Sequence, residues 1–177
     1  MLTRLALFDE LLEQRAPAIG KDLPAYRNHC YRIINFANAL AGGDPAQLDK
    51  LAIAAAFHDI GIWTHDTFDY LPPSEQQARN WLASKGNAAW CDEIIAMIAL
   101  HHKITACAPH HTALVEAFRQ ADWIDVTAGV ISHGLPRSFI RQVQAAFPDN
   151  GFHLRLLQLS VKRALRHPLN PLPMMRW

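Results

Sequence analysis

Apolar residues recur every three or four positions along most of the chain, which is the period of an amphipathic helix. The spacing is clearest over residues 2–12, 26–40, 92–102, 112–128, 136–147 and 152–166. Alternation of apolar and polar residues, the mark of a strand, does not continue over any useful length. The pattern therefore predicts an all-α protein built as a bundle of about eight helices.

Capping signals predict where the third helix of this bundle begins. Gly42-Gly43 favours the end of the second helix, and Asp44, Pro45 and Gln47 follow at once. Asp44 can cap a helix, Pro45 suits its first position, and Gln47 would complete a capping box. Apolar residues occupy nearly all sides of 51–57, so this helix is expected to be the most buried one.

Gly61 is expected to end the third helix, and residues 62–73 are expected to form an irregular loop rich in aromatic and polar side chains. A second capping box, Ser74 to Gln77, predicts the start of the next helix. Three prolines in residues 168–177 predict a non-helical tail. The remainder, 1–167, is expected to form a single domain because no repeat or low-complexity linker divides it.

Composition limits the kinds of partner that the protein can have. Among 177 residues, 50% are hydrophobic and 19% are charged, as is typical of a globular domain. The formal net charge of +1 argues against nucleic acid as a partner, although it is compatible with a local basic patch. Three cysteines without Cys-x-x-Cys spacing argue against disulfides and fit a reducing compartment. We expect a cytoplasmic protein with no membrane partner, and its oligomeric state stays open.

The candidate chemistry begins with His58-Asp59, a polar pair at the end of the apolar run 53–61. Burying an imidazole or a carboxylate is costly unless something satisfies it, and a divalent cation satisfies both. His29 lies one helix upstream and Asp122 lies further downstream on another predicted helix. These residues could also be satisfied by ordinary hydrogen bonds, but their ordered spacing over several helices favours a metal site.

The order His, His-Asp, Asp over residues 25–128 resembles the HD-domain superfamily of metal-dependent phosphohydrolases. The resemblance implies an HD-domain helical bundle in which His29, His58, Asp59 and Asp122 bind one divalent metal ion. Two imidazoles and two carboxylates without a thiolate suit manganese, iron, cobalt, nickel, magnesium or zinc.

Two residues near these ligands have alternative interpretations. Asp125 lies three residues beyond Asp122 on the same helical face, so it competes for the role of last ligand. We favour Asp122 because it follows Ala121, and the family's last aspartate usually follows a small residue; Asp125 would then support a ligand. Arg32 shares a helical face with His29 in a His-x-x-Arg-Ile run that resembles the family's. It is expected either to bind a phosphate or to pair with a buried carboxylate.

His101, His102 and Lys103 end another predicted helix. Some HD subfamilies place histidines here, where they bind a second metal ion or contact the substrate. Two-metal members usually carry a further histidine earlier, where this chain has Asn80 and Asn87. The sequence therefore favours one metal ion, with His101 or His102 as a general acid or phosphate donor and Lys103 as a nearby charge. The alternative is a helix end whose dipole favours cations.

The resemblance implies hydrolysis of phosphoric esters, with a small phosphorylated metabolite or nucleotide as substrate and Asp59 helping to orient the nucleophile. His65, in the predicted loop, is expected either to contact this substrate or to belong to a solvated turn. Other reactions found on similar scaffolds are alternatives, namely a di-iron oxygenase or a hydratase. A further alternative is a regulatory module that binds a metal ion without catalysis.

Overall fold

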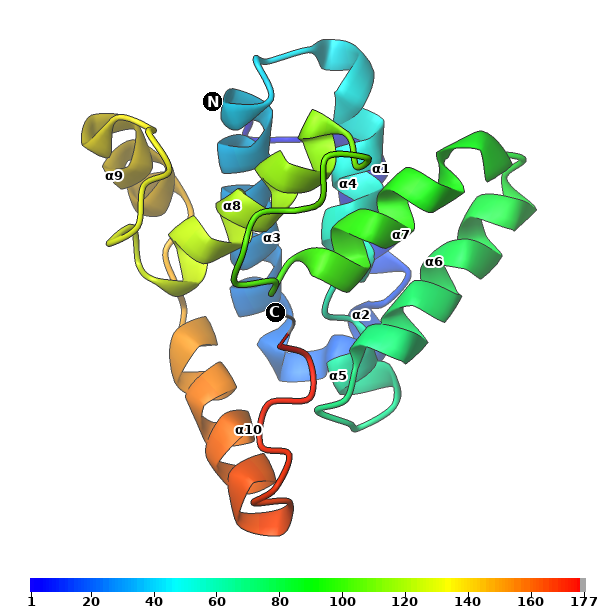
Figure 1. Ribbon diagram of the computed structural model, residues 1–177, viewed down its shortest axis with the longest axis vertical. Coiled ribbons are helices and arrows are strands. Elements are labelled where there is room, and N and C mark those ends of the chain that lie inside the picture. The colour runs from blue at the N-terminus through cyan, green and yellow to red at the C-terminus, as the bar shows by residue number, and fades with distance from the viewer. Residues whose placement is uncertain (176–177) are drawn as a thin grey trace.

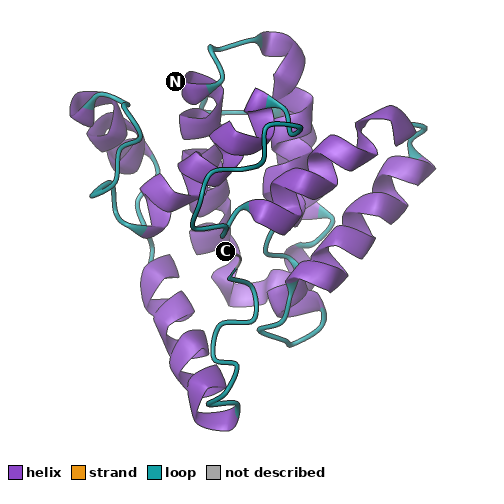
Figure 2. Cartoon of the chain, viewed as in Figure 1, coloured by secondary structure: helices purple, strands orange, loops and turns teal. Residues whose placement is uncertain are grey.

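The computed structural model describes residues 1–175, and within them it is helical, with no strand (Figure 2). The helices of eight or more residues are α1 (Ala6–Glu13), α3 (Leu23–Leu40), α4 (Leu48–Phe57), α6 (Leu71–Ser84), α7 (Cys91–Leu100), α8 (Ala113–Val126), α9 (Arg137–Ala146) and α10 (Phe152–Arg166). Two single turns, α2 (Ala16–Ile19) and α5 (Gly61–Thr64), and three 3₁₀ turns lie between them. The predicted all-α bundle of about eight helices is confirmed.

The core lies where α3, α4 and α8 meet, with α7 packed against α4 and α8 (Figure 1). Every side chain from Leu51 to Phe57 on α4 is buried, which confirms that this helix is the most enclosed. The buried apolar residues of α7 that pack towards it are Ile94, Ile95, Met97 and Ile98. An apolar core of this size supplies most of the stability that must hold polar groups in the interior.

The start of the third predicted helix differs in detail from the expectation. Asp44 accepts a hydrogen bond from the backbone nitrogen of Ala46 at 2.9 Å, so it is a cap. The turn that it caps, Pro45–Gln47, is a 3₁₀ turn, and α4 follows it. Gln47 does not complete a capping box, because its Oε1 is buried without a hydrogen-bond partner.

The segment expected to be an irregular loop is partly helical, and the predicted cap at Ser74 is wrong. α6 begins three residues earlier, at Leu71, because two prolines fit its first turn without losing a hydrogen bond. Ser74 is buried inside α6, and its Oγ accepts a hydrogen bond from the backbone nitrogen of Gly61 at 3.0 Å. A Cβ at Gly61 would lie 2.5 Å from the carbonyl oxygen of Tyr70, so this close approach requires glycine.

The described part of the tail, residues 168–175, is not helical, as predicted. It turns back to the bundle after α10 (Figure 1). Met174 is buried there in a small apolar cluster whose other buried members are Ile62, Phe68, Tyr70 and Leu71. Within residues 1–175, no helix combines the length and apolar character that crossing a bilayer requires.

Candidate metal centre

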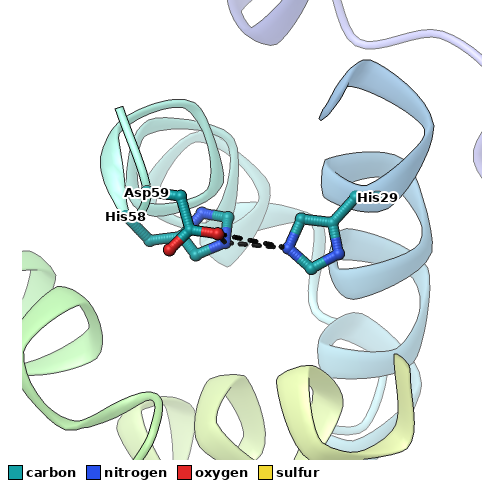
Figure 3. A group of neighbouring side chains, drawn as sticks. All are labelled: His29, His58 and Asp59. Carbon is teal, nitrogen blue, oxygen red and sulfur yellow. Dashed lines mark hydrogen bonds and ion pairs between the residues drawn. The ribbon is translucent and has the colours of Figure 1, made fainter. Parts of the chain in front are cut away.

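Buried histidines and aspartates from four helices gather at one end of the core. His29 lies on α3 and Asp122 on α8, whereas His58-Asp59 and His101-His102 directly follow the last residues of α4 and α7. All are buried except His102, whose side chain is 15% exposed. Figure 3 shows the ring of His29 pointing from α3 towards His58 and Asp59.

A first group of possible ligands consists of His29, His58 and Asp59. The Nε2 atoms of the two histidines are 3.0 Å apart, and Asp59 Oδ2 lies 3.3 Å from His58 Nε2 and 3.8 Å from His29 Nε2. Asp122 Oδ1 also lies 3.8 Å from His29 Nε2. The structure therefore brings three of the four sequence-predicted ligands into one group, and Asp122 lies beside this group next to His29.

A second group, Asp59 with His101 and His102, shares the same carboxylate. His101 Nε2 lies 3.4 Å from Asp59 Oδ1, the oxygen that is not directed at His58. His102 Nδ1 lies 3.2 Å from Asp122 Oδ2, close enough for an ion pair but without hydrogen-bond alignment. Within each group the ligand atoms lie within 4.8 Å of one another, so each group could hold a metal ion.

Hydrogen bonds on the outer side of three rings determine which nitrogen faces the centre. His58 and His101 each direct Nδ1 at the carbonyl oxygen three residues earlier, at 2.8 and 2.7 Å. His29 directs Nδ1 at Asp125 Oδ2, at 2.7 Å. Because a carbonyl oxygen or a carboxylate can only accept, Nδ1 carries the proton in each ring. The neutral rings therefore present the lone pair of Nε2 to the centre, as a metal-binding histidine does.

The atoms that face the centre repel one another unless a cation lies among them. Asp59 Oδ1, His101 Nε2 and both carboxylate oxygens of Asp122 are buried without a hydrogen-bond partner. Buried polar atoms without partners are rare, and a missing ion is one of the accepted reasons for them. The donor set thus fits a divalent cation.

Charge balance leads to the same result. Asp125 is neutralised by Arg32, whose Nε and Nη2 both donate to its carboxylate, the latter at 2.9 Å. Asp59 and Asp122 then remain as two buried negative charges, which one divalent ion neutralises. A second divalent ion would need additional anions, so the resting charge favours one resident ion.

The pKa shifts follow from burial and from these close contacts. Burial would raise the pKa of Asp59, but the neighbouring rings of His58 and His101 hold it well below its ordinary value. Burial lowers the pKa of His29 and of His101. For His58, burial alone would lower the pKa, but the charge and hydrogen bond of Asp59 together with the charge of Asp122 outweigh it, so the pKa is raised. Without a metal ion, a proton bound to His58 would supply the positive charge that the neighbouring carboxylates favour.

The structure places the three predicted substrate-binding residues differently. Arg32 is buried, and its third nitrogen, Nη1, donates to the carbonyl oxygen of Phe147 at 2.9 Å. Its contacts favour the alternative expected for it, an ion pair with a buried carboxylate. Lys103 directly follows the second group, and its Nζ donates to Thr105 Oγ1. His65 is exposed, with Nδ1 3.0 Å from Thr64 Oγ1, and none of its contacts in the described residues is with the centre.

Sequence reasoning missed several residues that support the centre. The hydroxyl of Tyr70 lies 2.6 Å from His102 Nε2, and burial raises the pKa of this tyrosine well above its ordinary value. Phe152 stacks on the ring of His29 with a centroid distance of 3.9 Å. His153 Nδ1 pairs with Asp149 at 2.8 Å. The contacts of Tyr70 and Phe152 have no signal in the local sequence, because each joins segments whose approach depends on the fold. His153 and Asp149 are four residues apart, so their pairing is local.

Comparison of the chain with protein-family models, curated proteins and solved structures gave no match. The class of site is therefore defined by the geometry alone. The site consists of two largely buried groups that share Asp59 and that could bind a metal ion, with Asp122 of α8 beside them.

Proposed function

We propose that this protein is a metal-dependent phosphohydrolase that acts on a small phosphorylated metabolite or nucleotide. The observation that carries the proposal is the convergence of imidazole lone pairs and unpartnered carboxylate oxygens around Asp59. The order of these residues along the chain, which resembles that of HD-domain phosphohydrolases, supports it.

His29, His58, Asp59 and Asp122 would hold the metal ion. When bound, a divalent ion lowers the pKa of water and stabilises the charge that develops on phosphoryl oxygens. Asp59 is suited to a second role, because its Oδ1 is not needed by the first group and can accept a hydrogen bond from the attacking water. Manganese, iron, cobalt, nickel, magnesium and zinc all suit this donor set.

His102 is better suited than His101 to protonate a leaving group. Burial lowers the pKa of His101, and its only proton near neutral pH is used in the bond to the backbone. The His102 side chain is 15% exposed, whereas those of Asp59 and His101 are at most 3% exposed. Substrate therefore approaches past His102, and Lys103, the next residue, adds a positive charge on that side.

The test is elemental analysis of protein purified without chelator, followed by a panel of phosphate esters with each divalent cation. Roughly one divalent ion per chain and metal-dependent release of phosphate are expected. Asp59→Ala should lose both the ion and the activity, because it removes a ligand and a charge. Asp49→Asn, an exposed change on α4, is the matched control. Wild-type metal content in Asp59→Ala, or hydrolysis that persists without metal, would refute the proposal.

One observation favours a second candidate function. The two groups share Asp59 through different oxygens, which is the arrangement of a carboxylate between two metal ions. A di-iron oxygenase needs such a pair. Iron at roughly two ions per chain, with dioxygen consumption and without phosphatase activity, would favour the oxygenase over the hydrolase.

A further inference from the structure

α10 has an apolar face that the rest of residues 1–175 leaves uncovered. Leu154, Leu157, Val161 and Leu165 follow one another at intervals of three or four, so they share one side of the helix. Their exposed fractions are 59%, 61%, 51% and 81%. The opposite side carries Phe152, which is buried against the bundle. In Figure 1, α10 extends away from the other helices.

The charged residues in the segment that carries this face are all basic. Residues 150–177 contain five arginines and lysines and neither aspartate nor glutamate, whereas the whole chain has 17 basic and 16 acidic residues. Lys162 and Arg166 are exposed and line the same shallow hollow as Leu157, Val161 and Leu165. A row of large apolar side chains is thus flanked by cations.

A second, deeper pocket adjoins this face. It has a volume of about 160 Å³ and lies between α10 and the segment after α5. Lys162, Arg163, Arg166 and His167 line it, and Asp66 contributes its one acidic side chain. A pocket of this size and charge suits a phosphate group, and Lys162 and Arg166 belong to both hollows.

We propose that α10 binds the surface of an anionic phospholipid bilayer. The leucines and the valine would enter the boundary between headgroups and acyl chains, and the basic pocket would take a lipid phosphate. An apolar face edged by lysine and arginine is the composition of helices that lie in this interface. The net charge of the whole chain does not indicate such a basic surface, because the excess of cations is confined to the last 28 residues.

The charge argues against a second copy of this chain as the occupant. Two α10 helices packed through their apolar faces would bring Lys162 and Arg166 of each copy together. No acidic side chain in residues 150–177 could oppose them, and Asp66 is the one acidic residue that lines the pocket beside them. Burying like charges at a helix pair is destabilising, whereas anionic lipid opposes them throughout.

Vesicle flotation tests the proposal, with phosphatidylcholine vesicles compared with vesicles that also contain phosphatidylglycerol. The chain should float only with the anionic vesicles, and less at high salt. Leu157→Gln with Leu165→Gln should weaken binding more than roughly tenfold. Lys162→Gln with Arg166→Gln should weaken it roughly 25-fold, at about fivefold for each cation. These side chains are exposed, so the variants should retain wild-type circular dichroism.

Matched controls remove similar groups elsewhere. Val130→Gln removes an apolar side chain that is 75% exposed, and Arg141→Gln removes an exposed cation on α9. Both should bind anionic vesicles as the wild type does. Failure of the wild type to bind, or equal loss in the controls, would overturn the proposal. Light scattering can detect a dimer of the chain. If the wild type forms a dimer and does not bind vesicles, and if Leu157→Gln with Leu165→Gln dissociates that dimer, the face would be assigned to a second copy instead.

Discussion

Asp122 and Asp125 lie one helical turn apart on α8, yet the structure gives them opposite roles. Asp125 accepts hydrogen bonds from His29 and Arg32, and none of these three side chains is more than 2% exposed. Asp122 accepts no hydrogen bond, and its oxygens face the centre. Replacing each aspartate by asparagine removes one charge and preserves shape, so the two variants separate support of the fold from binding of the metal.

In metal-free protein the two changes should have different effects on stability. Asp125→Asn removes the carboxylate that binds the buried Arg32 guanidinium through two hydrogen bonds and leaves only Asp149, at 3.9 Å, as a counter-charge, which costs about 3–5 kcal/mol. For a chain of this length, the melting temperature should fall by roughly 6–20 °C. Asp122→Asn breaks no hydrogen bond, and it weakens both the repulsion between Asp122 and Asp59 and the attraction between Asp122 and His102. The melting temperature of this metal-free variant should therefore fall less than that of Asp125→Asn.

Metal affinity should show the reverse order. Asp125→Asn alters only the residue that orients His29, so affinity should fall by about 10- to 100-fold. Asp122→Asn removes a ligand and one of the two charges that the ion neutralises, so its loss should be larger. Calorimetric unfolding of chelator-treated protein and metal titration measure the two quantities, with Asp49→Asn as control. A lower metal-free melting temperature for Asp122→Asn than for Asp125→Asn would refute the assignment of roles.

Three further predictions follow from the same geometry. His102→Gln should lower turnover while metal content stays near that of the wild type, whereas the exposed His110→Gln should change neither; unchanged activity in His102→Gln would exclude the acid role. Metal occupancy, measured by dialysis at a series of pH values, should decrease as the pH falls. The decrease should begin above the ordinary histidine pKa of about 6.5, because the pKa of His58 is raised and its ring must lose a proton to bind metal. Gly61→Ala should reduce the free energy of unfolding by about 1–3 kcal/mol, because its Cβ meets the Tyr70 carbonyl oxygen, and an unchanged denaturation midpoint would contradict this contact.

Helices could be predicted from the apolar period, but their first residues depended on contacts outside the local sequence. The bounds of α10 agree with the predicted range because Gly151 and Pro168 limit it on both sides. Ser74 has the local features of a cap, yet its hydroxyl binds the backbone of Gly61, thirteen residues earlier. That bond exists only once α5 and α6 have packed together. The local rule for helix capping therefore singled out Ser74, but in the tertiary structure its hydroxyl binds the backbone of another helix.

The candidate site shows the same limit. His29, His58 and Asp59 could be identified because their order along predicted helices resembles a known pattern. The approach of His101 to the second oxygen of Asp59 could not be predicted, since no spacing specifies how α7 crosses α4. Tyr70 was also missed, because the register of α6 that places it against His102 was predicted incorrectly. His65 repeats the His-Asp dipeptide but is exposed, so the dipeptide alone does not define a ligand.

The position of the centre at the ends of α4 and α7 explains how an apolar core can contain it. Both helices end directly before a histidine, so the negative ends of two helix dipoles converge on the place where a cation would bind. Their last carbonyl groups also hold the Nδ1 protons of His58 and His101. If His101 were merely a charged residue at a helix end, its pKa would be raised by the dipole. Burial lowers that pKa instead, so the ring is neutral and presents a lone pair. The helix ends therefore attract the cation and orient its ligands at the same time.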